Sequence, residues 1–130
     1  MVKETQSSFL KRSAQKVGQP QQFYYNTIVS VFDFIDENRM LVASALKSSM
    51  FPVLLEIVSE QTARDVREQL EQDVRNGKEL PASPVILAQL FTGALIRVSK
   101  WWLLENEKTP KVQMIEQTAA LLLPPMAVQG

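Results

Sequence analysis

The 130-residue sequence contains no cysteine and no histidine, and these two absences narrow the chemistry open to the chain. Without cysteine there is no disulfide and no thiolate nucleophile. Without histidine the chain lacks the side chain best suited to proton transfer near neutral pH, which is also the commonest transition-metal ligand. Nucleophiles activated by histidine are therefore excluded, and a zinc site would have to be built from carboxylates alone. We expect no catalytic residues, no metal site and no cofactor.

The sequence also has only four glycines, a formal net charge of zero and no long apolar run. The four glycines are isolated, and none belongs to a phosphate-binding loop. No apolar run approaches the roughly 20 residues of a membrane span, and the N-terminus lacks the core of a signal peptide. The 14 basic and 14 acidic residues cancel, whereas a DNA-binding domain usually has a basic face. These features predict a cytoplasmic, non-enzymatic protein that has no membrane partner and does not contact DNA directly.

The composition that remains suits one folded domain, with 45% hydrophobic and 22% charged residues. Residues 1–20 are polar and predict a solvated leader or a short helix, which Gly18 and Pro20 end. A basic DNA-binding arm is the less favoured interpretation of this leader. Residues 21–130 are expected to form one all-helical domain.

Helical spacing dominates the first half of that domain. Apolar residues recur at intervals of four, three and four between residues 20 and 37, at Tyr24, Ile28, Val31 and Ile35. A second helix is predicted through Leu41–Leu46. Pro52 fits the first turn of a third helix, which Asn76 and Gly77 end.

Two apolar helices are predicted in the second half. Ser83 and Pro84 supply a cap and a first-turn proline for a helix that contains both tryptophans and ends near Asn106. Thr109 and Pro110 open the next helix, which Pro124 stops. The predicted fold class is therefore an all-α bundle of five to six helices.

Gly93 lies inside the first of these apolar helices, where glycine costs roughly 1 kcal/mol relative to alanine. The cost is easiest to understand if another backbone passes close to it. A chain this small can hardly cover both apolar helices, so we expect a two-fold homodimer in which they meet their copies in a four-helix arrangement. The predicted interface residues are Leu90, Gly93, Ala94, Arg97, Trp101, Ile115, Ala119 and Leu122. The alternative is that Gly93 and the tryptophans fill one monomeric core.

Two stretches resemble a known family. Residues 33–41 (Asp-Phe-Ile-Asp-Glu-Asn-Arg-Met-Leu) are similar to an acidic-Asn-Arg corner in the C-terminal regulatory domains of TetR-like transcriptional repressors. Residues 88–123 resemble the last two helices of those domains, with an internal Gly-Ala step, a Trp-Trp-Leu exit, a Thr-Pro start and a closing leucine run. The resemblance covers residues 22–123.

The resemblance implies a domain that dimerises through its last two helices and encloses an effector pocket among the middle ones. Binding of a small apolar molecule there would lower the affinity for DNA. The bulky residues expected to line the pocket are Tyr24, Phe32, Met50, Phe51, Leu55, Phe91 and Trp102. Arg97 and Lys100 are expected to form ion pairs at the surface or interface, with binding of an acidic effector as the alternative.

The helix-turn-helix head of such regulators has no counterpart in residues 1–22. We therefore expect DNA contact only through a helix-turn-helix domain outside this chain. The chain itself would then be either a fragment of a longer regulator or a regulator that naturally lacks this domain. The leading interpretation is an effector-sensing and dimerisation domain. The alternative is a helical adaptor, scaffold or heterodimerising protein without a ligand pocket, and a carboxylate-based enzyme ranks third.

Overall fold

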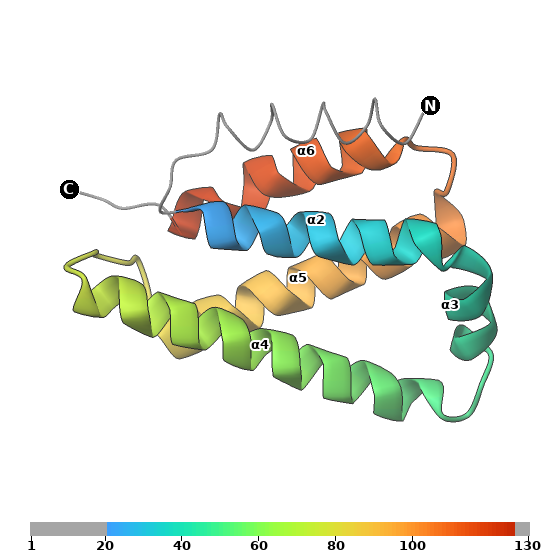
Figure 1. Cartoon of the computed structure of the whole chain (residues 1–130), viewed down its shortest axis with the longest axis horizontal. Coiled ribbons are helices and arrows are strands. Elements are labelled where there is room, and N and C mark those ends of the chain that lie inside the picture. The colour runs from blue at the N-terminus through green and yellow to red at the C-terminus, as the bar shows by residue number, and fades with distance from the viewer. Residues whose placement is uncertain (1–20, 127–130) are drawn as a thin grey trace.

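The computed structural model describes residues 21–126 and contains five α-helices in that range (Figure 1). They are α2 (Gln22–Glu37), α3 (Arg39–Leu46), α4 (Phe51–Arg75), α5 (Pro84–Glu105) and α6 (Lys111–Leu122), followed by a 3₁₀ turn, η2 (Pro124–Met126). The all-α fold class is confirmed. The leader predicted at residues 1–20 lies outside the described residues, as do residues 127–130.

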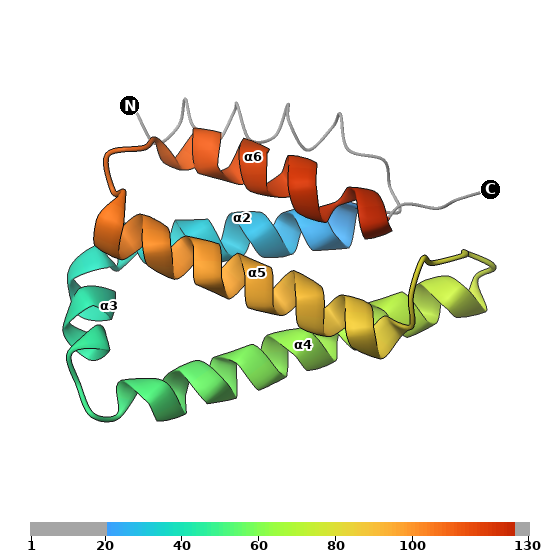
Figure 2. The same ribbon diagram turned by 180° about the vertical axis from the view of Figure 1, so that it is seen from behind.

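The helices pack around α2 and α5. Figures 1 and 2 both show α2 between α6 on one side and α4 on the other. Helices α4 and α5 form an antiparallel pair, and α6 returns along α2. The short α3 joins the end of α2 to the start of α4. Within residues 21–126, no single helix is long and apolar enough to cross a membrane, and only the pair α3 and α4, bent by 118°, passes that test together.

The end of α4 and the start of α5 follow the local signals of the sequence. The Ser83 hydroxyl accepts a hydrogen bond from the Ile86 amide at 3.4 Å, and Pro84 occupies the first turn of α5. At the end of α4, Gly77 has a φ of +91°, a conformation that suits glycine. The Lys78 amide then donates to the Asp73 carbonyl at 3.0 Å, which closes the helix end. These predicted boundaries are confirmed.

The core contains one face of every helix except α3. Its largest fully buried side chains come from α2, α4, α5 and α6, namely Tyr24, Ile28, Phe32, Val66, Leu70, Phe91, Leu95, Trp102 and Ile115. Aromatic rings contact one another edge to face inside it, with centroids 5.9 Å apart for Tyr24 and Phe91 and 5.4 Å apart for Phe32 and Trp102. Three of the four residues of the stripe predicted on α2, namely Tyr24, Ile28 and Ile35, are therefore buried in the core, and Val31 is partly buried.

Only the C-terminal half of α4 is packed into this core. Its buried residues are Ala63, Val66, Leu70 and Asp73. In the N-terminal half, apolar side chains remain exposed, among them Leu54 and Val58 at 49% and 55%. Helix α4 therefore lies against the bundle at one end and leaves it at the other, where α3 connects it to α2 (Figure 1).

Candidate functional site

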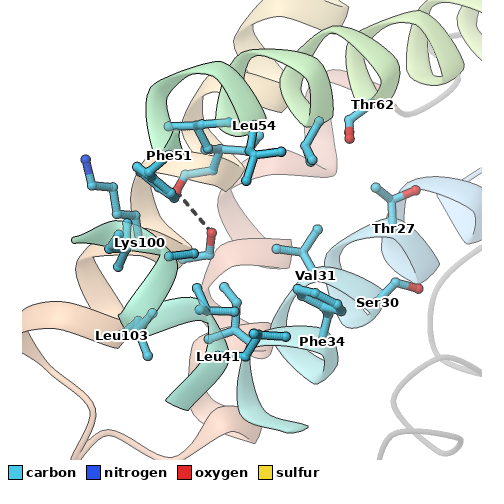
Figure 3. A pocket seen from close by; sticks show the side chains of 18 of the residues that line it. Thr27, Ser30, Val31, Phe34, Leu41, Phe51, Leu54, Thr62, Lys100 and Leu103 are labelled. Atoms are coloured by element: carbon cyan, nitrogen blue, oxygen red, sulfur yellow. Dashed lines mark hydrogen bonds between the residues drawn. The ribbon is translucent and has the colours of Figure 1, made fainter. Parts of the chain in front are cut away.

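A cavity of about 940 Å³ lies where α4 diverges from the bundle. All four of the helices α2 to α5 contribute to its wall (Figure 3). The lining residues are Phe23, Asn26, Thr27, Ser30, Val31, Phe34, Ile35, Leu41, Val42, Ala45, Leu46, Phe51, Leu54, Leu55, Val58, Thr62, Ile96, Ser99, Lys100 and Leu103. A volume of this size is at the upper end of the range for small-molecule sites.

The wall of the cavity is mostly apolar and partly open to solvent. Phe34 and Leu41 belong to it although 57% and 65% of their surfaces are exposed. Exposed apolar side chains that gather around a concave surface are typical of a binding site, because single exposed apolar residues are normally scattered. The cavity is therefore the candidate functional site.

A few polar groups interrupt the apolar wall. Thr27 and Ser99 both donate their hydroxyl hydrogens to carbonyls of their own helices, at 3.0 Å in each case. Of the described residues that line the cavity, Lys100 alone carries a charge. Its ammonium nitrogen lies 5.8 Å from the centroid of the Phe51 ring, within the range of a cation–π contact.

The structure places only two of the seven predicted pocket residues on this cavity, namely Phe51 and Leu55. Met50 is 56% exposed and lies outside the lining. The other four, Tyr24, Phe32, Phe91 and Trp102, are core residues with at most 1% of their surface exposed. They pack against one another because the stripes on which they lie face the centre of the bundle.

Sequence reasoning missed the neighbours of those stripes. Val31 and Ile35 belong to the apolar stripe predicted on α2, and both line the cavity; Ile35 is buried as well. Thr27, Ser30 and Phe34 sit on the next face of the same helix. Polar and apolar side chains alternate along this second face of α2. That mixed pattern is the one local signal in the sequence that could have indicated a solvent-accessible cavity wall instead of a core.

Tyr24 belongs to a buried polar link between α2 and α4. Its hydroxyl donates to an Asp73 carboxylate oxygen at 2.6 Å, and the Gln69 amide donates to the other oxygen at 3.0 Å. The Lys78 ammonium lies 3.6 Å from the same carboxylate. Burial, the hydrogen bond to Asp73 and the negative charge of Asp73 together raise the pKa of Tyr24 well above its ordinary value of 10.0. This link fixes the C-terminal half of α4 to α2.

The acidic-Asn-Arg corner is a charged cluster at the other end of α2. Asp36 pairs with Arg39 at 3.1 Å, and the Arg39 guanidinium lies 4.4 Å from the centroid of the Trp102 ring. Lys111 at the start of α6 pairs with Asp33 at 2.8 Å and with Asp36 at 3.5 Å. Burial alone would lower the pKa of Lys111, but the hydrogen bonds and charges of Asp33 and Asp36 outweigh it and raise the pKa.

The loop between α5 and α6 is held against the same cluster. The Trp102 indole N–H donates to the Thr109 carbonyl at 2.8 Å, and the Asn106 amide donates to the Thr109 hydroxyl at 2.6 Å. The two sequence stretches that resembled a family therefore meet in space, since the corner at residues 33–41 contacts Trp102 and the start of α6. These contacts are structural and lie outside the cavity lining.

The predicted interface residues divide between two environments. Leu90, Gly93, Arg97 and Trp101 are exposed on one face of α5, and Ala94 and Leu122 are half-buried. Ile115 and Ala119 instead face inward, at 0% and 7% exposure, because α6 packs this stripe against α2. The large apolar residue of α6 that is exposed is Leu121, at 78%.

Gly93 and Arg97 show how open this face of α5 is. Apart from Gly93 itself, its two chain neighbours and the nearby backbone of α5, no atom of the described residues lies within 4 Å of the position that a Cβ at Gly93 would occupy. The close approach expected there is therefore not made within the protomer. Arg97 likewise forms no ion pair within residues 21–126, and neither does Lys100.

The chemistry of the cavity suits binding. Its wall offers a large apolar surface, one cation and several hydroxyl groups, which is the usual composition of a small-molecule site. Within the described part of the chain, no three acidic residues gather closely enough to hold a metal ion.

Comparison with known protein families gives a match over most of the chain. A family model described as a transcriptional regulator C-terminal region, from the TetR group, matches residues 19–123. No curated protein and no solved structure matches the chain. The matched range includes all five described α-helices up to Leu122.

Proposed function

Because the chain belongs to the TetR group of transcriptional regulator C-terminal regions, we propose that it is an effector-sensing and dimerisation domain of a TetR-like regulator. The cavity among α2 to α5 is the proposed effector site, and the exposed face of α5 with the end of α6 is the proposed dimer interface. Any DNA contact is proposed to come from a helix-turn-helix domain and not from these helices.

The single observation that carries the effector proposal is the cavity, about 940 Å³ in volume and lined mainly by apolar side chains. Its walls come from four helices, so an occupant would bear on the relative position of α4 and the rest of the bundle. A ligand that prefers one position of α4 would shift the population toward it. That shift would provide the signal that a regulator needs.

Filling the cavity is expected to abolish the binding of an apolar probe. Ala45 lines the wall, and Ala45→Phe places a ring inside it. With the neutral fluorescent probe N-phenyl-1-naphthylamine, we expect the variant to lose affinity by about tenfold or more, equivalent to about 1.4 kcal/mol. Ala43→Phe is the matched control, because Ala43 lies on the same helix but outside the lining. Unchanged probe affinity in Ala45→Phe, or no probe binding to the wild type, would argue for a scaffold without an effector site.

The dimer proposal rests on the uncovered apolar residues of the last two helices. Ile86, Leu90, Trp101 and Leu104 of α5 are between 45% and 63% exposed, and Leu121 of α6 is 78% exposed. Gly93 leaves open backbone in the middle of this face. A self-complementary apolar patch around a glycine suits close packing of two copies about a two-fold axis.

Charge in the middle of this face is expected to separate the protomers. Leu90→Glu would bury a carboxylate in an apolar interface, where an unpaired charge is costly. We expect the wild type to sediment as a dimer at micromolar concentration and Leu90→Glu to sediment as a monomer. Ile57→Glu is the matched control, because Ile57 is a similarly exposed apolar residue on α4, outside the proposed interface. A monomeric wild type would refute the proposed interface.

A further inference from the structure

Among residues 21–126, Lys100 is the one charged group on the cavity wall, and no carboxylate of these residues pairs with it. Within the described part of the chain, no acidic residue lines the cavity and none forms an ion pair with Lys100. Its described contact is with the Phe51 ring, at 5.8 Å from the ring centroid. A cation that lies beside an apolar cavity and has no counter-ion among the described residues can form a charge-assisted hydrogen bond with an anionic group of a ligand.

The position of Lys100 fits the head group of an amphiphile. Figure 3 shows the side chain beside Phe51 at one side of the lining, with its ammonium nitrogen directed away from the middle of the cavity. Thr27, Ser30 and Thr62 lie on the opposite side of the same view. Between these two polar sides the wall is formed by aliphatic and aromatic residues such as Val31, Leu54 and Leu103.

We propose that the ligand is a singly charged anionic amphiphile of the long-chain carboxylate class; this proposal rests on the proposed effector site. Its carboxylate pairs with the Lys100 ammonium at the edge of the cavity, and its hydrocarbon chain extends along the apolar wall. The ion pair between the carboxylate and Lys100 neutralises the Lys100 charge. The hydrocarbon tail of the ligand covers exposed apolar surface of α2, α3 and α4 and so removes it from water. A cationic amphiphile would instead place like charges together at Lys100.

The ligand class can be tested with three probes that share one chain length and differ in the charge of the head group. These probes are dodecanoate, dodecanol and dodecyltrimethylammonium, each measured by displacement of N-phenyl-1-naphthylamine from the full chain below its micelle concentration. We expect dodecanoate to bind most tightly. Lys100→Met keeps an apolar stem and should weaken dodecanoate about fivefold to tenfold, the range for losing a charge-assisted contact, while leaving dodecanol unchanged.

Two further variants make the result decisive. Lys100→Glu should reverse the order, so that dodecyltrimethylammonium binds more tightly than dodecanoate. Lys108→Met, in the exposed loop before α6, should behave as the wild type. If dodecanoate and dodecanol bind alike and Lys100→Met changes neither, the anion proposal is overturned while the effector site stands. If N-phenyl-1-naphthylamine itself does not bind the wild type, both proposals fail.

Discussion

Trp102→Ala is expected to lower the free energy of unfolding by about 4 kcal/mol, the usual cost of truncating a large buried aromatic side chain. Trp102 is fully buried against Phe32. Its indole N–H donates to the Thr109 carbonyl, and its ring lies under the Arg39 guanidinium. The substitution therefore removes core packing and also releases the start of α6. Urea denaturation at a fixed protein concentration measures the loss.

The neighbouring tryptophan provides the matched control. Trp101 is 45% exposed and lies on the open face of α5. Trp101→Ala should change the unfolding free energy of the protomer by less than about 1 kcal/mol, although it should weaken the proposed dimer. Equal losses from the two substitutions would contradict the assignment of Trp102 to the core and Trp101 to the surface.

Asp73→Ala is expected to cost about 3 kcal/mol, because it leaves the buried Tyr24 hydroxyl and the Gln69 amide without their acceptor. Asp73 is 2% exposed; its hydrogen bond from Tyr24 joins α2 to α4, and its hydrogen bond from Gln69 lies within α4. Tyr24→Phe removes one donor and should cost about 1 kcal/mol. The double variant should lose less than the sum by about 1 kcal/mol or more, because the two residues share one interaction.

Asp65→Ala is the control for this cycle, because Asp65 lies on the same helix and, among the described residues, accepts a side-chain hydrogen bond only from the exposed Gln61. It should change stability by less than about 0.5 kcal/mol. Additive losses in the Asp73 and Tyr24 variants would show that their hydrogen bond contributes no coupling energy.

The same link predicts a dependence on alkaline pH. Because burial and Asp73 raise the pKa of Tyr24 in the folded state, the phenol stays protonated there while the unfolded chain ionises near pH 10.0. The stabilisation is complete below that pH and is lost as the pH rises above it. Tyr24→Phe should therefore lose stability less steeply above pH 10, by up to about 1.4 kcal/mol per pH unit.

Helix positions and the core of α2 could be predicted because local chemistry determines them. The cap at Ser83, the left-handed turn at Gly77 and the buried stripe of Tyr24, Ile28 and Ile35 depend on residues a few positions apart. Ile115 and Ala119, predicted at the dimer interface, are instead buried within the protomer, because their environment depends on a distant segment of the chain. An apolar stripe does not say whether it faces its own protomer or a second copy, and here α2 covers it.

The cavity could not be predicted in the same way, because it depends on how α4 is oriented over its whole length. Tyr24 and Asp73 fix one half of the helix, and the eight residues of α3 determine where the other half begins. Side chains such as Leu54 and Val58 carry no sequence mark that separates a cavity wall from a core. Phe51 and Leu55 are the two predicted pocket residues that lie on the diverging half of α4 and line the cavity.

Helix α5 has consequences for how freely this protein can vary. Phe91, Leu95 and Trp102 fill the core, and Ile96, Ser99 and Lys100 border the cavity. Leu90, Gly93 and Trp101 form an apolar outer face. In the proposed dimer few positions of this helix would have water as their only neighbour, so random mutagenesis should yield far fewer tolerated changes in α5 than along the outer side of α4. Substitutions that change the preference for a ligand during evolution would then occur mainly in α3 and α4, because a new side chain there can reshape the cavity without disturbing the rest of the bundle.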